Sequence, residues 1–266
     1  MEHGIIPISN WQLALSVVLV LLAGMVSAFL KLGLLKSLAW GTVRAFIQLT
    51  LIGYVLAYIF EWNNLFIIIP IIFFMCLVAA REATRRVNEP TQQPMLVSFI
   101  SLSASTFLVG LIVVGLIIGP DPWYSARVMI PIFGMILGNS MNGISLALDR
   151  MYGEIRAHVD EVEELLCFGA TPWEAVRDLV RKAVKAGMTP TINSLMVVGL
   201  VSLPGMMTGQ ILAGADPREA VRYQIVVMVM VAAAVAVGCL LIVGLSYRKV
   251  FTEDLALVTD MRRSNG

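Results

Sequence analysis

The sequence predicts an all-α polytopic membrane protein with about seven transmembrane helices, its N-terminus outside and its C-terminus in the cytosol. Of the 266 residues, 58% are hydrophobic and 14% are charged, and the mean hydropathy is +0.84. A soluble domain is about 25% charged. The apolar residues also gather in stretches of roughly 20, the length that a helix needs to cross a bilayer. Because lipid offers no hydrogen-bond partner to the backbone, these stretches are expected to be helical.

Seven stretches meet this requirement. In chain order they are Trp11–Leu32, Ser37–Phe60, Leu65–Ala80, Met95–Ile118, Ala126–Leu148, Pro190–Ala213 and Ala220–Tyr247. Residues 1–10 hold no Lys or Arg, unlike the start of a signal peptide, so the first stretch is expected to stay in the protein. Most Lys and Arg residues follow the first, third, fifth and seventh stretches. Short cytosolic loops collect such residues, which predicts the stated orientation and favours an odd number of spans.

The composition also argues against several function classes. The net charge is +1 and the basic residues are dispersed, so no nucleic-acid partner is expected. The sequence contains no G-x-x-x-x-G-K-[ST] motif for nucleotide, and its two histidines, His3 and His158, lie outside the predicted spans. The three cysteines are scattered, as is typical of reduced structural thiols. We therefore expect no cofactor on this chain and no catalytic residue, and no metal ligand can be named.

The single transmembrane domain, residues 1–266, contains one segment long enough to fold in the cytosol, residues 149–189. Its first half predicts a helix whose apolar residues recur at helical spacing, at Ile155, Val159, Val162 and Leu166. The opposite face is acidic, with Glu163 and Glu164 among its residues. Gly169 is expected to end this helix.

The second half predicts another helix with a strong start signal. Thr171 is placed to cap it, Pro172 stands at its first position and Glu174 completes a capping box. Its apolar face is expected to contain Val176, Leu179, Val180 and Ala183. The two helices thus form a hairpin, acidic in one arm and basic in the other.

Two interpretations of this hairpin stay open. It is either a linker between two spans, whose amphipathic faces rest on the membrane surface or on each other, or a coupling element whose elbow docks into a groove on a cytosolic protein. In the second interpretation the contact residues are Glu163, Glu164, Phe168, Gly169, Ala170 and Thr171.

Polar residues inside the predicted spans are candidates for a transport path. Arg44 and Gln48 share one face of the second span, and Asn139 and Asn142 share one face of the fifth. An intramembrane Arg usually faces a bundle interior or a wet cavity. The alternative is that Arg44 extends toward the interface and the amides join neighbouring helices.

The sixth span contains Pro204, Gly205, Met206 and Met207 in succession. A Pro-Gly pair removes a backbone hydrogen bond and predicts a kink, which serves as a hinge, a ligand site or a packing feature. The two thioethers are soft metal ligands in principle, or packing residues.

Three runs of sequence resemble the FetB-like family of ABC transporter permeases, which includes a bacterial iron-export permease and plant aluminium-tolerance half-transporters. They are Gly134–Gly143, Gly199–Gly214 and Asp216-Pro217 followed by Tyr223–Ile225, and Arg44 and Gln48 fit as well. The resemblance implies a multi-pass permease of the bacterial inner (plasma) membrane that exports iron. It also implies a homodimer of permeases paired with a separate cytosolic ABC ATPase subunit, which binds the ATP and Mg²⁺.

Two other functions remain in view. No Asp or Glu lies deep in a predicted span, and Arg44 would repel a bare cation, so the cargo is alternatively a metal chelate or an anionic small molecule such as a nucleotide sugar. A membrane scaffold that transports nothing and holds a cytosolic partner is the third possibility. A lone P-loop ATPase encoded beside this chain would favour transport.

Overall fold

The computed structural model describes residues 9–31, 33–85, 87, 94–252 and 254–258. This part of the chain is almost entirely helical and includes six helices long and apolar enough to cross a membrane. The all-α polytopic prediction is therefore confirmed. The orientation stays a prediction from the positions of Lys and Arg.

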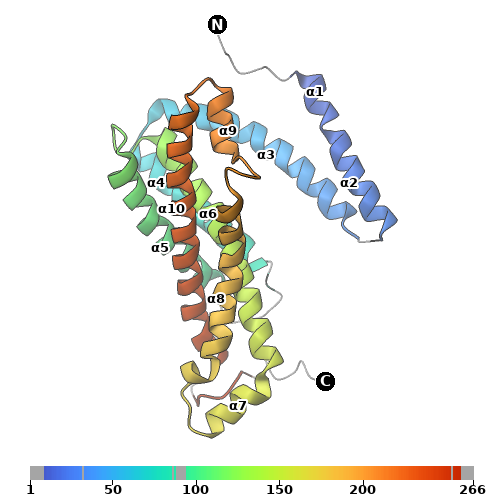
Figure 1. Cartoon of the computed structure of the whole chain (residues 1–266), viewed down its shortest axis with the longest axis vertical. Coiled ribbons are helices and arrows are strands. Elements are labelled where there is room, and N and C mark those ends of the chain that lie inside the picture. The colour runs from blue at the N-terminus through green and yellow to red at the C-terminus, as the bar shows by residue number, and fades with distance from the viewer. Residues whose placement is uncertain (1–8, 32, 86, 88–93, 253, 259–266) are drawn as a thin grey trace.

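The helices follow one another with short connections (Figure 1). They are α1 (Asn10–Leu15), α2 (Val17–Phe29), α3 (Leu35–Trp62), α4 (Leu65–Arg85), α5 (Pro94–Ile112), the π-helix η1 (Val113–Ile118), α6 (Ala126–Ala157), α7 (Val159–Cys167), α8 (Pro172–Val197), α9 (Gly205–Leu212), α10 (Pro217–Ser246) and the 3₁₀ turn η2 (Tyr247–Val250).

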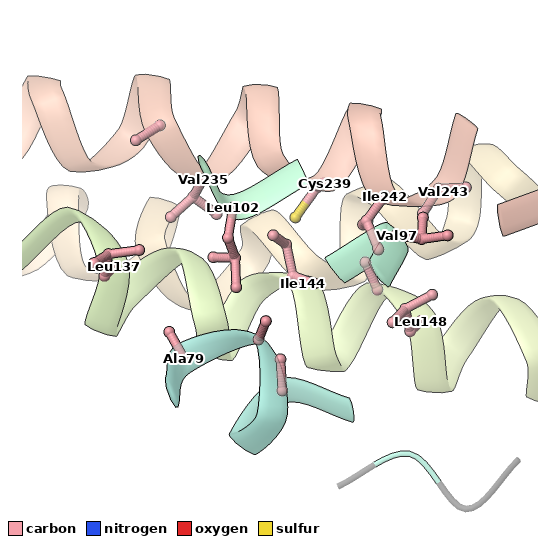
Figure 2. Close-up of a cluster of buried hydrophobic side chains, with 14 of the residues drawn as sticks. Ala79, Val97, Leu102, Leu137, Ile144, Leu148, Val235, Cys239, Ile242 and Val243 are labelled. Atoms are coloured by element: carbon pink, nitrogen blue, oxygen red, sulfur yellow. The ribbon is translucent and has the colours of Figure 1, made fainter. Parts of the chain in front are cut away.

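Helices α4, α5, α6, α8 and α10 form the bundle that contains the core. Figure 2 shows apolar side chains from four of them meeting, among them Leu102 of α5, Ile144 of α6 and Cys239 of α10. These three side chains are fully buried. Helix α6 has the most extensive buried face, because it packs against α4, α8 and α10. It is the central element of the bundle.

Helix α2 and the first part of α3 form a hairpin that stands apart from this bundle, whereas the C-terminal end of α3 reaches it, where Leu56, Ile59 and Phe60 pack against the core (Figure 1). No residue of α3 is buried, although this helix is 28 residues long and strongly apolar. Within the described part of the chain, α3 packs mainly on α2 and touches α6 only slightly. Its surface is therefore available to lipid or to another protein chain.

The predicted sixth span, Pro190–Ala213, is not one helix. Its first part is the end of α8, which runs without interruption from the cytosolic segment through Pro190 to Val197. The chain then leaves the helix at 198–204 and resumes as the short helix α9. The predicted kink is thus a complete break, because Gly199 adopts a left-handed φ of 81° and Pro204 starts a new helix.

Candidate functional site

A cavity of about 410 Å³ lies beside this break, between α6, the α8–α9 connection and α10. Its lining is Met135, Asn139, Asn142, Gly143, Gly187, Pro190, Thr191, Ser194, Val198, Ser202, Pro204, Gly205, Met206, Gln224, Val227, Met228 and Val231. None of these residues is charged. Amides, hydroxyls and thioethers are its polar and polarisable groups.

The backbone explains why the α8 helix ends at the cavity. Val198 is extended, and the N–H groups of Val201 and Ser202 fold back to donate to the carbonyl of Val197. The Gly199 N–H donates to the Ser202 carbonyl at 2.9 Å instead of continuing the helix. Lipid tolerates non-helical backbone only where protein or a cavity satisfies it. This segment meets that condition through its own turn and through the cavity beside it.

Helix α9 begins at the cavity, and no side chain caps the N–H groups of its first turn. Pro204 is the N-cap residue and makes no side-chain capping bond. The first intrahelical bond runs from the Thr208 N–H to the Pro204 carbonyl. The N–H groups of Gly205, Met206 and Met207 precede it, and such N-terminal groups have no acceptor within their own helix.

Two glycines bring α6 and α8 together at one wall of the cavity. A Cβ built on Gly187 would lie 2.6 Å from the Gly143 carbonyl oxygen and 2.7 Å from the Cys239 Sγ. A Cβ on Gly143 would lie 2.7 Å from Val235 Cγ1. Only a residue without a side chain fits at either position.

Gln224 lines the cavity from α10 and was not singled out from the sequence as a site residue. It is 5% exposed, and its Oε1 has no hydrogen-bond partner in the described structure. A buried amide of this kind costs free energy unless it is satisfied. The feature of the sequence that could have indicated Gln224 is a single amide side chain within a long apolar stretch.

The structure brings together five of the eight predicted transport-path residues. Asn139, Asn142, Pro204, Gly205 and Met206 all line the cavity. Asn139 and Asn142 approach it from α6 and the other three from the break. Their role in transport stays a prediction.

The remaining three, Arg44, Gln48 and Met207, are not among the lining residues. Arg44 and Gln48 lie exposed on α3. The Arg44 Nη1 is 3.7 Å from the Glu82 Oε1 of α4. The sequence prediction ended its third span at Ala80 and so missed this acidic partner.

The predicted elbow lies at the end of the molecule occupied by α7 (Figure 1). Helix α7 ends at Cys167, and Gly169 has a φ of 89°, a left-handed conformation that favours glycine. Thr171 and Glu174 form the predicted capping box, in which the Thr171 N–H donates to Glu174 Oε2 at 2.8 Å. The Phe168 side chain is 82% exposed. The elbow is a defined turn with an aromatic ring at its surface.

Most of the apolar residues predicted for the two helices are buried, among them Val159, Val162, Val176 and Ala183, and α7 packs against α8. The first predicted helix is divided, because Ile155 belongs to the end of α6 and α7 begins at Val159, and Leu166 is half-buried. A second cavity, of about 400 Å³, separates the elbow from the C-terminal segment at 254–257. Glu163, Gly169 and Ala170 are among its lining residues. The Glu164 side chain is exposed.

An ion-pair cluster joins the elbow region to the spanning bundle. Glu154 of α6 accepts a hydrogen bond from Lys182 Nζ of α8 at 3.1 Å. Its other carboxylate oxygen lies 2.7 Å from Arg150 Nη2. The Arg150 and Lys182 side chains are half exposed, so each pair contributes only modestly to stability. The Lys182–Glu154 contact lies between the elbow and the cavity and adds to the extensive packing of α8 on α6.

The described part of the chain contains no group of three or more His, Cys, Asp or Glu residues arranged to hold a metal ion. No metal ligand is therefore assigned.

The profile of the uncharacterised protein family UPF0014 matches residues 10–251. The chain belongs to the UPF0014 family.

Relatives of this UPF0014 protein cover nearly its whole length. A UPF0014 membrane protein of Synechocystis is 37% identical over 97% of this chain and 100% of its own. The probable iron export permease protein FetB of Escherichia coli is 36% identical over 94% of this chain and 95% of its own. Protein ALUMINUM SENSITIVE 3 of Arabidopsis thaliana is 35% identical over 95% of this chain and 91% of its own. No solved structure matches the UPF0014 chain significantly.

These matches confirm the resemblance found from the sequence. The UPF0014 chain is a multi-pass membrane protein of a family that includes a probable permease. The cavity residues at 134–143 and 199–214 lie inside the region that the family profile covers.

Proposed function

We propose that this chain is the membrane subunit of an ABC exporter of the bacterial plasma membrane, and that its cargo is iron. ATP and Mg²⁺ would bind to a separate ATPase subunit. The observation that carries the proposal is the continuity of α8, which begins at Pro172, directly after the elbow, and ends at Val197, directly before the cavity-lining residue Val198. At about 1.5 Å per residue, its 26 residues span roughly 39 Å.

This continuity supports a mechanical role. A force applied at the elbow would displace α8. Thr191 and Ser194 of this helix, and Val198 directly after it, line the cavity and would move with it. Because α6 packs extensively against α8 and its Glu154 bonds Lys182, α6 is expected to move with it, and α6 supplies Asn139 and Asn142. Elements packed in this way shift between discrete arrangements. The breaks at Gly199 and Pro204 let α9 respond separately.

The elbow is the proposed contact with the ATPase. Glu163, Glu164, Phe168, Gly169, Ala170 and Thr171 are its proposed contact residues. An exposed aromatic side chain at the end of an acidic helix fits a groove with an apolar floor and a basic rim. Phe168 supplies the aromatic side chain, and α7 supplies the acidic residues Asp160 and Glu161 in addition.

We propose that a second copy of the permease packs against α3. This helix carries Arg44 and Gln48 exposed at membrane depth. Polar groups in a span almost always face protein or water because lipid cannot solvate them. A homodimer that packs α3 against another chain would satisfy this requirement.

The proposal is tested by producing the chain with the ATPase encoded beside it. We expect the two proteins to copurify and ATP hydrolysis to rise when iron, free or chelated, is added to the reconstituted pair. Charge reversal at Glu163 and Glu164 should abolish copurification, whereas charge reversal at Asp178 of the exposed α8 surface is the control. Undiminished copurification with both elbow changes would contradict the assigned docking surface.

A further inference from the structure

Resting on the proposed function, we infer that the surface that docks the ATPase has two halves, the elbow and a C-terminal turn formed by residues 250–252 and 254–258. The cavity of about 400 Å³ between these halves receives an apolar projection of the ATPase. Acidic residues on both sides of the cavity match a basic surface around that projection. The elbow and the C-terminal turn lie at the same end of the molecule (Figure 1).

The C-terminal turn has a fixed position beside the elbow. Val250 and Leu257 are buried and belong to the hydrophobic core. The Val258 N–H donates to the Val250 carbonyl at 3.0 Å, which closes the turn on itself. Tyr247, at the start of η2, lies with its ring centroid 5.3 Å from that of Trp173 in the first turn of α8. The segment that follows α10 is therefore packed against the helix that starts at the elbow.

Leu255 stands at the tip of this turn in an unusual conformation. Its φ is 61°, in the left-handed region that few residues other than glycine adopt. Its N–H donates to the Thr252 carbonyl at 3.0 Å, and the Thr252 N–H donates to the Ala256 carbonyl at 2.7 Å. Strained backbone of this kind is found where the surrounding structure holds a residue for a function. The side chain that this conformation presents is apolar and exposed.

The two halves of the surface expose apolar side chains away from lipid. Phe168 on the elbow is 82% exposed and Leu255 on the C-terminal turn is 55% exposed. Both lie outside the membrane spans, at the end of the molecule that the proposed function places in the cytosol. Leu166, Ala170 and Leu257 continue this apolar surface into the cavity. Apolar patches that face water mark sites of protein interaction.

The charge around the cavity selects the partner. Glu163 from α7 and Asp254 from the C-terminal turn line it, and its described lining contains no Lys, Arg or His. Asp160 and Glu161 add to the acidic character of α7. An anionic lipid surface would be repelled, and a second copy packed through the same face would bring the same negative charge. A basic surface on a cytosolic protein is complementary, and the ATPase is the cytosolic partner of the proposed function.

Leu255 allows the docking role to be separated from a role in folding. Asn adopts left-handed conformations more readily than Leu. Leu255→Asn should therefore leave the chain at least as stable as wild type while it removes the exposed apolar side chain. Leu255→Met is the matched control, because it keeps an apolar side chain of similar volume.

The experiment measures, by biolayer interferometry, the Kd between the full chain in detergent and the ATPase encoded beside it. We expect Leu255→Asn to weaken binding by about ten-fold, with its Tm unchanged or raised, and Leu255→Met to bind as wild type does. The same measurement in lipid nanodiscs tests the alternative of a membrane contact. A loss of binding in nanodiscs that is absent in detergent would assign Leu255 to the lipid surface and overturn the inference.

Asp254 gives an independent readout through its charge. Wild-type binding should weaken as the salt concentration rises, and Asp254→Asn should weaken binding at low salt and reduce that salt dependence. An unchanged salt dependence would contradict the inferred charge complementarity. If charge reversal at Glu163 and Glu164 abolishes binding while Leu255→Asn binds as wild type, this inference fails and the proposed function stands. A wild-type chain that does not bind the ATPase would overturn both.

Discussion

The contact between α6 and α8 at Gly187 offers a quantitative test of the packing that forms the cavity wall. A Cβ at Gly187 would stand 2.6 Å from the Gly143 carbonyl oxygen, 2.7 Å from Cys239 Sγ and 2.9 Å from Ala147 Cβ. The first and last are backbone and near-backbone atoms that cannot rotate away. Gly187→Ala must therefore push α8 away from α6.

The magnitude follows from two opposing effects. Inserting an extra methyl group into a packed core costs about 1–3 kcal/mol, and three contacts under 3 Å place this site at the upper end. Replacing glycine by alanine inside a helix returns about 1 kcal/mol. The net loss is about 2 kcal/mol, which corresponds to a decrease in Tm of about 4–8 °C for a chain of this size.

The assay is thermal unfolding of the purified chain in detergent, followed by the loss of helical circular dichroism. Gly138→Ala is the matched control, because Gly138 also lies in a spanning helix and a Cβ there meets nothing within 4 Å. We expect the control to match wild type or to unfold slightly higher. Equal Tm values for Gly187→Ala and Gly138→Ala would refute the close helix contact.

Changes at four further positions probe the elbow, the start of α8 and the α3 helix. Gly169→Val should abolish copurification with the ATPase because φ is 89° there, whereas Gly169→Asn, which tolerates that conformation, should retain it. Thr171→Ala should lower Tm by about 2–4 °C through loss of about 1 kcal/mol of capping. Hydrogen bonds from Thr171 hold the pKa of Glu174 below its ordinary value. The ionised Glu174 therefore stabilises the folded chain at pH values above its pKa in the unfolded chain, and this stabilisation is lost as the pH falls through its pKa in the folded chain. The difference in Tm between wild type and Glu174→Gln should accordingly shrink on acidification. Arg44→Ala should reduce transport and leave Glu82 without its charge partner, and full transport at normal expression would contradict the assigned role.

The local features of the elbow could be predicted from the sequence because they depend on near neighbours. A capping box needs only Thr171 and Glu174, three residues apart. The buried faces of α7 and α8 follow from apolar residues at helical spacing, and Val176 and Ala183 are fully buried as that spacing predicts. The membrane spans are equally local, since length and hydropathy determine them.

The course of the sixth span could not be predicted in the same way. The apolar pattern places Pro190 at its first residue, but the structure keeps Pro190 inside α8. A proline within a membrane helix is tolerated where neighbouring helices support the backbone around it. Gly187, three residues before Pro190, packs directly against Gly143 of α6, and this contact between distant residues is not visible in the sequence.

The cavity itself depends on contacts between distant parts of the chain. Asn139, Pro204 and Gln224 come from three separate elements, and nothing in their spacing says that they share one space. Gly187 carries no pattern that separates it from other glycines, because its importance arises from Gly143 and Cys239. Polarity within a span indicated which residues to consider, and the packing of α6, α8 and α10 determined which of them meet.

The most direct test of the proposed exporter is transport into inside-out proteoliposomes that contain this chain and the ATPase encoded beside it. Radioactive iron, supplied free or as ferric citrate, should accumulate inside only when both proteins and ATP are present, and Gly169→Val should reduce that accumulation while Gly169→Asn does not. Equal accumulation without the ATPase, or none with the active pair for free and chelated iron alike, would contradict the proposed function.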